Sequence, residues 1–360
     1  MNVAVLGTDF GVEHIRLYKQ LKSIHSITVF GRNEKKLREI RAEWNVETTT
    51  DIHSILTDDT IKLVDVCLPT NVHKEYVINA LKHGKDVFCE TPIAHTLEDA
   101  RAMLETADEL GQRLWINQFI KREAPYQVLA NAYEDNLYGK LKLLHIQRLT
   151  PPLWGDLSLK TLSTDLMIHD CDVVSGLLGV PKRVTSIGAS HLQGQSQLYG
   201  LLQYPDTLVH MEGASMMPFG FPFRVGFKAV FEEATLEYQE DGFRDEVVEW
   251  FKRYSDGRCE DVVYTKGNCL EETLKEVVNL CLSERQASNL DAAYAVASLE
   301  LALTLKEQVI GLKNQKRCCA SGFPFIVDLL LPSQQSLLYV LLDVSRLLLH
   351  LQPCCPLGQL

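Results

Sequence analysis

The sequence predicts an α/β protein with two differently built domains. Residues 1–120 alternate short, continuously apolar strands with amphipathic helices, an arrangement typical of a parallel sheet covered on both faces. Residues 121–315 contain consecutive strands joined by short turns, which predicts an open, mostly antiparallel sheet. Several strands of the first domain end in polar residues, and ligands of such sheets bind outside the carboxyl ends of the strands.

Composition places the chain among ordinary globular proteins. Of its 360 residues, 46% are hydrophobic and 23% are charged, which is enough for two domains. The formal net charge of −11 argues against a general affinity for nucleic acid, which requires clustered Lys and Arg. The amino terminus reads as a strand and not as a signal peptide, and the ten cysteines lack the spacing of a disulfide framework. We therefore expect a cytoplasmic protein with reduced thiols.

The first domain is expected to alternate strand and helix from its first residues. The strands are predicted at Val3–Leu6, Ile27–Phe30, Leu63–Leu68, Val87–Cys89 and Leu114–Ile116. The helices are predicted at Val12–Lys22, Glu34–Trp44, from Pro69-Thr70-Asn71 onward, and at Thr96–Leu110.

The first turn, Gly7-Thr8-Asp9-Phe10-Gly11, has some features of a dinucleotide-binding loop. Glycines there let backbone amides and a helix amino terminus approach a pyrophosphate, as Gly7 and Gly11 would. Asp9 opposes this interpretation because it adds negative charge where a diphosphate would lie. An ordinary strand-to-helix turn is therefore the alternative, but the succession of β-α units favours a cofactor loop that also includes Thr8 and Phe10.

The end of the second strand bears on the choice of cofactor. An acidic residue there holds the ribose hydroxyls of NAD, whereas Arg accommodates the 2′-phosphate of NADP. The chain has Gly31-Arg32 and no acid at this edge, which favours NADP over NAD. A solvated Arg32 that opens a charged helix is the alternative interpretation.

The second domain is expected to contain both helices and a run of strands. The helices are predicted at Glu123–Leu137, Leu162–Leu178, Leu270–Arg285 and Leu290–Leu312. The strands are predicted at Leu141–Arg148, Arg183–Ile187, Gln197–Gln203, Thr207–Ala214, Phe223–Phe231, Ala234–Tyr238 and Glu246–Phe251. Trp154, Tyr126 and the stretch Pro218–Phe223 are candidates for lining a pocket, with the core or the sheet edge as the alternative.

Asp165 and His169 are four residues apart, so they would lie on one face of the predicted helix Leu162–Leu178. The imidazole titrates near neutrality, and the carboxylate would fix its tautomer or stabilise its protonated form. An ordinary solvated pair is the alternative. His169, Asp170 and Asp172 have the chemistry to bind a divalent ion, but no Cys or His cluster has the spacing of a structural site, so no metal is predicted.

Three motifs, taken in order along residues 1 to about 313, resemble those of the Gfo/Idh/MocA family, the relatives of glucose–fructose oxidoreductase and inositol dehydrogenase. They are Val64-Asp65-Val66-Cys67-Leu68-Pro69-Thr70-Asn71-x-His73, Gly84-Lys85-Asp86-Val87-Phe88-Cys89-Glu90-Thr91-Pro92 and Thr164-Asp165-x-x-x-His169-x-x-Asp172.

The resemblance implies a Rossmann dinucleotide-binding domain at residues 1–120 and a substrate and dimerisation domain at residues 121–315. It implies hydride transfer between NADP or NAD and a sugar, polyol or similar small hydroxy or carbonyl compound. We also expect a homo-oligomer formed through the C-terminal sheet, no nucleic-acid partner and no integral membrane segment.

The resemblance also carries over individual residues. His169, Asp165 and Thr91 take the catalytic positions, and Asn117 and Asp172 are implied to bind substrate. The implied cofactor-binding residues are Gly7, Thr8, Phe10, Gly11, Arg32, Pro69, Thr70, Asn71, His73, Glu90 and Pro92.

Thr91 departs from the family pattern, which has Lys at this position. A Lys ammonium orients the substrate oxygen and transfers a proton, whereas Thr does not titrate near neutrality. We therefore assign the acid/base role to His169, with Asp165 as its partner or as a ligand of a substrate hydroxyl, and Thr91 as a positioning group. One alternative is a non-catalytic nucleotide- or sugar-binding regulatory protein that descends from an enzyme. Another is a lyase or glycosidase that uses the nicotinamide transiently.

Residues 316–360 form an atypical tail rich in Leu and Cys. From Arg317 onward it has only four formal charges, and its charged residues and prolines argue against a transmembrane helix. A buried helix, a dimer element, a peripheral membrane contact and a non-native extension are the interpretations that stay open.

Overall fold

The computed structural model describes residues 1–191, 194–243, 246–283 and 287–311. Contacts between residues group Met1–Leu312 into one compact unit, which contains both predicted sheets. The predicted tail at 316–360 lies outside the described residues, and the domain boundary at residue 120 stays a prediction. No helix in the described part of the chain is long and apolar enough to cross a membrane.

The first sheet is parallel and has six strands in the order β3-β2-β1-β4-β5-β6. The strands are β1 (Asn2–Leu6), β2 (Ser26–Phe30), β3 (Glu47–Thr49), β4 (Ile61–Val66), β5 (Asp86–Cys89) and β6 (Leu114–Ile116). The helices between them are α1 (Gly11–Tyr18), α2 (Glu34–Trp44), α3 (Ile52–Leu56), α4 (His73–Lys82) and α5 (Leu97–Leu110), with a 3-10 turn η1 (Thr70–Val72) before α4. This order confirms the predicted covered parallel sheet.

The apolar strands form the centre of this sheet because both of its faces are buried. Val3, Val5 and Leu63 pack on one side, and Ala4 and Val64 pack on the other. The short elements β3 and α3 were not predicted, because three to five residues carry little periodic signal.

The second sheet is mixed and mostly antiparallel, in the order β14-β13-β12-β11-β7-β10-β9-β8-β15. Its strands are β7 (Leu141–Leu149), β8 (Arg183–Ser190), β9 (Ser196–Gln203), β10 (Leu208–Ala214), β11 (Phe223–Phe231), β12 (Thr235–Phe243), β13 (Glu246–Ser255), β14 (Arg258–Asp261) and β15 (Val309–Gly311). Only β10 with β7 and β15 with β8 pair in parallel. The predicted α/β fold class is confirmed.

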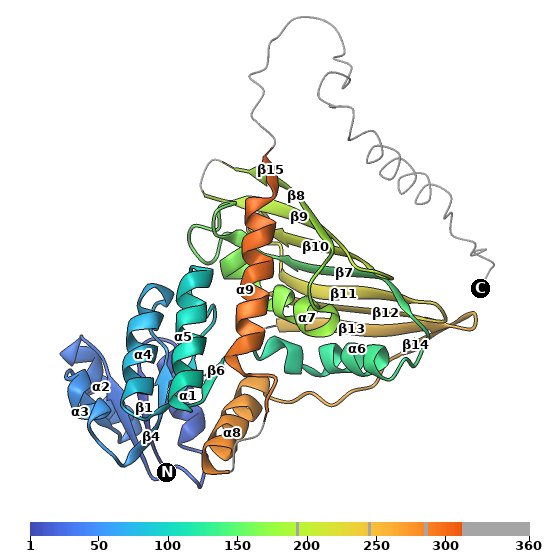
Figure 1. The fold of residues 1–360 in the computed structure, drawn as a ribbon. Coiled ribbons are helices and arrows are strands. Elements are labelled where there is room, and N and C mark those ends of the chain that lie inside the picture. Colours follow the sequence, from blue (N-terminus) through green and yellow to red (C-terminus); the bar gives the residue numbers. More distant parts are fainter. Residues whose placement is uncertain (192–193, 244–245, 284–286, 312–360) are drawn as a thin grey trace, which may run out of the picture. The chain divides into compact units, whose positions relative to one another are not determined.

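Helices cover one face of the second sheet, as Figure 1 shows for α6 (Ala124–Glu134), α7 (Ile168–Leu178) and α9 (Ala292–Glu307). Side chains alternate accordingly along the strands: Leu198 and Leu202 are buried, whereas Tyr199 is 38% exposed. The remaining helix, α8 (Cys269–Leu282), returns to the first sheet and adds Leu274 to its core.

The helix predicted at Leu162–Leu178 is interrupted in the structure. Leu162–Leu166 form a π-helical turn, η3, and α7 begins only at Ile168. The chain is wound more loosely through the turn than in an α-helix, so a four-residue spacing no longer places two side chains on one face. This break changes the relation between Asp165 and His169.

The helices α1 and α9 differ most from their predicted carboxyl ends. The helix expected at Val12–Lys22 ends at Tyr18, because after Lys19 the amides of Gln20 and Leu21 bond to carbonyls three residues back instead of four. The helix expected at Leu290–Leu312 ends at Glu307, and the chain then pairs with β8 as β15.

Candidate active site

The segments predicted to bind the cofactor meet at one edge of the parallel sheet. They follow the adjacent strands β2, β1, β4 and β5, and parallel neighbours present their carboxyl ends at the same edge. The sheet order therefore brings together Arg32, the turn Gly7–Gly11, the segment Pro69–His73 and the segment Glu90–Pro92.

The turn between β1 and α1 has no space for larger residues at its glycines. Gly7 has a φ of +130°, and a Cβ there would lie 2.3 Å from the carbonyl oxygen of Cys67. A Cβ on Gly11 would lie 3.0 Å from Val5 Cγ1. Phe10 precedes α1 without a side-chain cap, and the amides of Val12 and Glu13 donate to the carbonyl oxygens of Asp9 and Phe10 at 3.1 and 3.0 Å. The amino terminus of α1 therefore favours an anion through its helix dipole and not through these two amides.

The charge of Asp9 is compensated within the protein. Lys36 Nζ lies 2.6 Å from Asp9 Oδ1, and the Asp9 side chain is 85% exposed. The negative charge of Asp9 therefore repels a diphosphate at this turn less than the sequence alone indicated. Arg32, at the end of β2, is exposed and has no ion-pair partner among the described residues, so its guanidinium is available to a 2′-phosphate.

Glu90 is held by a buried polar network that starts at the core of the first sheet. His14 Nδ1 lies 2.8 Å from Asp65 Oδ2, which also accepts a hydrogen bond from Tyr18 at 2.9 Å. His14 Nε2 lies 3.0 Å from Glu90 Oε1, and Asn117 Nδ2 donates to the same oxygen at 2.6 Å. Burial opposes a charge on His14, but the Asp65 carboxylate raises its pKa well above the usual value. The network therefore fixes Glu90 and Asn117 side by side at the carboxyl edge.

His14, Cys67 and Glu90 place one metal-ligating atom each within 4.8 Å of one another. Both nitrogens of His14 already face carboxylates, and burial raises the pKa of the Cys67 thiol well above its usual value, which disfavours the thiolate that a metal needs. We therefore interpret this group as part of the hydrogen-bonded network.

His73 stabilises the loop that follows β4. The residue is buried, and its Nε2 lies 2.7 Å from the carbonyl oxygen of Leu68. Burial lowers the pKa of His73, so the neutral ring donates to the loop that follows β4. It orients Pro69, Thr70 and Asn71 without reaching a ligand through its own ring.

His169 lines a cavity of about 340 Å³ on the helix-covered side of the second sheet, together with Arg148, Trp154, Leu157, Asp165, Leu166 and Phe223. The Phe119 ring lies 6.2 Å from the imidazole. Burial, and then the charge of Arg148, lower the pKa of His169 to about 3. The imidazole is therefore neutral at physiological pH, and its buried Nδ1 has no hydrogen-bond partner in the described chain.

The predicted contact between Asp165 and His169 is wrong for this structure. Asp165 is exposed on the π-helical turn, and its Oδ1 accepts a hydrogen bond from Thr164 Oγ1 at 2.9 Å. No hydrogen bond joins it to His169 among the described residues, because the helix break rotates it off the imidazole's face. Both residues nevertheless line the same cavity.

Asp172 is separated from this cavity. It is buried on α7, and its Oδ1 lies 3.1 Å from Lys121 Nζ. Burial raises the pKa of Asp172 to about 6, although Lys121 opposes the shift. Asp172 and Lys121 line a different cavity, of about 160 Å³. Asp172 therefore does not lie in the cavity of His169, where its predicted role in substrate binding would require it.

Several of the predicted residues carry buried polar atoms that the protein leaves without partners. They include Thr91 Oγ1, Asn117 Oδ1 and His169 Nδ1. Native proteins rarely leave such atoms unpaired unless a ligand or water completes them. Together with the glycine turn at the carboxyl edge, these atoms fit a site for a dinucleotide and a polar substrate.

Arg148 was not predicted from the sequence, and only some of the predicted pocket residues line the His169 cavity. Trp154 and Phe223 do line the His169 cavity, where their rings meet edge to face at 5.0 Å. Tyr126 instead packs in the core against Phe227. No motif marked Arg148, because a single Arg at the end of a strand reads as a surface residue.

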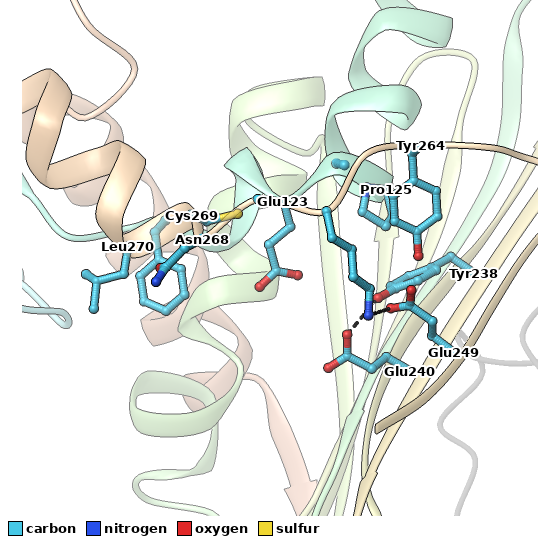
Figure 2. Close-up of a pocket in the computed structure, with 13 residues that line it drawn as sticks. Glu123, Pro125, Tyr238, Glu240, Glu249, Tyr264, Asn268, Cys269 and Leu270 are labelled. Atoms are coloured by element: carbon cyan, nitrogen blue, oxygen red, sulfur yellow. Dashed lines mark hydrogen bonds and ion pairs between the residues drawn. The ribbon is translucent and has the colours of Figure 1, made fainter. Parts of the chain in front are cut away.

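A second cavity, of about 410 Å³, adjoins Phe119 and is drawn in Figure 2. Glu240 and Glu249 face each other across β12 and β13 in this cavity, and Lys266 Nζ lies 2.6 Å from Glu249 Oε2. Glu123, just before α6, has no partner for its carboxylate in the described chain and does not cap that helix. Burial, and then repulsion by Glu240, raise the pKa of Glu123 to about 7.

Comparisons with known proteins agree with this geometry. Residues 1–118 match the model of an oxidoreductase family with an NAD-binding Rossmann fold. An inositol 2-dehydrogenase from Pseudomonas syringae pv. syringae is 29% identical over 206 residues, covering 54% of this chain and 61% of that protein. A 2,7-anhydro-N-acetylneuraminate hydratase from Mediterraneibacter gnavus is 27% identical over 206 residues, covering 55% of this chain and 54% of that protein. The chain thus spans little more than half the length of these curated relatives.

The fold also recurs in a solved structure. A UDP-N-acetylglucosamine 3-dehydrogenase from Acidithiobacillus ferrooxidans matches with a TM-score of 0.73 at 20% identity, covering 86% of this chain and 97% of that chain. At this identity the match concerns the fold alone.

The raised pKa of Glu123 predicts a pH-dependent stability. A carboxyl whose pKa is higher in the folded state stabilises the protein fully only below its unfolded pKa, and this contribution is lost as the pH rises through about 7. Glu123→Gln should therefore raise the free energy of unfolding at pH 8 by about 1–3 kcal/mol over wild type, with little gain at pH 4.5. Urea unfolding at both pH values measures the effect. The exposed Glu134→Gln on the same helix serves as control, and equal gains in both variants would contradict the assignment.

Proposed function

Because the chain belongs to the Gfo/Idh/MocA oxidoreductase family and is distantly homologous to inositol 2-dehydrogenases, we propose that it is an NAD(P)-dependent oxidoreductase. Its substrate is a sugar, polyol or similar small hydroxy or carbonyl compound. The observation that carries this proposal is the cavity in which Asp165 and the neutral His169 lie together.

The carboxyl edge of the first sheet supplies the cofactor site. The turn Gly7–Gly11 and the amino terminus of α1 hold the pyrophosphate, and Arg32 receives the 2′-phosphate, so NADP is favoured over NAD. Glu90 and Asn117 orient the nicotinamide end through their shared hydrogen bond. When bound, the nicotinamide supplies hydride transfer; the protein residues supply position and proton handling.

His169 handles the proton of the substrate hydroxyl. The neutral imidazole accepts a hydrogen bond and then the proton through Nδ1, which the protein leaves free. Its low pKa in the free protein means that it holds no proton beforehand, so it serves as a base in the oxidation direction. The exposed Asp165 lines the same cavity and accepts a hydrogen bond from another hydroxyl of the substrate.

Replacement of the base tests this assignment. His169→Ala should lower turnover by about 10²–10⁴-fold with little change in cofactor affinity, because a general base contributes only to the chemical step. Steady-state kinetics and a cofactor titration separate the two effects. The exposed His53→Ala is the matched control, and an unchanged turnover in His169→Ala would discard the role.

A second candidate function is a non-catalytic binding or regulatory protein. It is favoured by Thr91, which stands where the resembling family has Lys and whose Oγ1 is buried without a partner. Under our proposal, Thr91→Lys changes turnover less than about tenfold, because proton transfer runs through His169. A protein without turnover that gains it in Thr91→Lys would instead be a former enzyme. Thr57→Lys, at an exposed position, controls for the added charge.

We also propose that the open face of the second sheet binds a second copy of the chain. Ile187 and Tyr199 on this face are each 38% exposed, and the Tyr199 and His145 rings flank His210 in a stack. Aromatic residues of this kind are enriched at interfaces. Light scattering should give a dimer or a larger oligomer that Tyr199→Arg dissociates, and a monomeric wild type would exclude the interface.

A further inference from the structure

The cavity around His169 contains a buried cation, Arg148, which has no role in the proton transfer proposed for His169. Arg148, near the end of β7, is only 4% exposed. Its Nε and Nη2 each donate to an oxygen of Asp170 at 2.9 Å, a bidentate geometry that fixes the plane of the guanidinium.

This ion pair also fixes Arg148 relative to the imidazole. Asp170 follows His169 directly on α7, so the strand and the helix that line the cavity are joined at that position. The Arg148 charge is one of the two causes that lower the pKa of His169, which places the two groups in electrostatic contact. The other ionisable groups that act on Arg148 besides Asp170 are Tyr126 and Glu123.

One edge of the guanidinium is left without a partner. Its third nitrogen, Nη1, makes no hydrogen bond within the described residues, and His169 Nδ1 in the same cavity makes none either. A buried polar atom without a partner, such as His169 Nδ1, costs about 1–3 kcal/mol. Arg148 Nη1 also has no partner but is not fully buried, so it is open to a ligand in the cavity that would complete both groups.

We propose that Arg148 is a substrate-contacting residue whose Nη1 donates a hydrogen bond to the oxygen of the reacting carbon, in place of the ammonium that Thr91 cannot provide. This inference rests on the proposed oxidoreductase function. The guanidinium keeps all its protons at any physiological pH, so it orients and stabilises the oxygen while His169 takes the proton.

The rest of the lining specifies the ligand class. The cavity combines Trp154 and Phe223, whose rings can pack on the C–H face of a small ring, with the exposed carboxylate of Asp165, which accepts hydroxyl hydrogen bonds. Since Asp170 already balances Arg148, Asp165 leaves the site with a net negative charge, which disfavours anionic substrates. The ligand is therefore a neutral, polyhydroxylated ring.

The test removes the charge of Arg148 together with that of its ion-pair partner, Asp170. Loss of Arg148 alone leaves Asp170 buried and unpaired, which can unfold the protein, so the main variant is Arg148→Met/Asp170→Asn. Arg148→Lys is the conservative variant, which retains the charge and loses the bidentate geometry. The control is Arg253→Met/Glu260→Gln, which removes a second Arg–carboxylate pair of the same sheet that lies outside the cavity.

Each protein is titrated with NADPH and then, with NADP⁺ present, with myo-inositol as the probe, and turnover is followed by nicotinamide absorbance. We expect Arg148→Met/Asp170→Asn to bind NADPH like wild type, to bind myo-inositol at least about tenfold more weakly and to lose about 100-fold or more in turnover. Arg148→Lys should recover part of the loss, and the control variant should match wild type.

The other outcomes overturn the inference in distinguishable ways. Wild-type affinity and turnover in Arg148→Met/Asp170→Asn would exclude a substrate contact and leave the oxidoreductase function intact. A wild type that binds NADPH but not myo-inositol would refute the ligand class. A wild type that binds neither NADPH nor NADH would remove the proposed function itself.

Discussion

The buried ion pair between Arg148 and Asp170 is the interaction on which the candidate site depends. It joins β7 to α7, so it sets the distance between the sheet of the second domain and the helix that carries His169. Buried pairs of this kind add little to stability compared with apolar packing, but breaking one partner is costly. The pair therefore constrains geometry more than it stabilises the fold. Burial is the main cause of the low pKa of His169, and the Arg148 charge lowers it further because it opposes a second cation nearby.

A separate network performs the same task on the cofactor side. His14, Asp65 and Tyr18 are hydrogen-bonded to one another in the core. His14 Nε2 lies 3.0 Å from Glu90 Oε1, and Asn117 donates a hydrogen bond to the same oxygen at the carboxyl edge. Side chains that are hydrogen-bonded to a rigid core hold their orientation before any ligand arrives. The two networks thus order the proposed cofactor edge on the first sheet and the proposed substrate cavity on the second.

The sequence predicted the fold well because the relevant signals are periodic and local. A continuously apolar run such as Val3–Leu6 in β1 excludes most alternatives, and the alternation in β9 indicates a sheet with one covered face. The carboxyl-edge positions of Gly7, Glu90 and Asn117 follow from strand order, which the sheet topology confirms. Short elements such as β15 were missed, since three residues paired only through tertiary contacts leave no pattern in the sequence.

The site was less predictable because its chemistry depends on packing. The spacing of Asp165 and His169 indicated a contact only if the helix were regular, and the π-helical turn removes that condition. The pKa of His169 is lowered first by burial and then by the charge of Arg148, a residue of a different element that belongs to no motif. Lys36, which compensates Asp9, is likewise visible only once α2 is placed beside the first turn.

The central claim is that the carboxyl edge holds a nicotinamide cofactor facing the cavity of His169 and Arg148. A crystal structure of the protein grown with NADP⁺ tests it most directly. The account predicts a pyrophosphate at the turn Gly7–Gly11, the 2′-phosphate at Arg32, and the nicotinamide ring open toward the His169 cavity, with space for a substrate carbon about 3–3.5 Å from its reactive carbon. A nicotinamide directed away from that cavity, or a dinucleotide bound elsewhere on the protein, would contradict it.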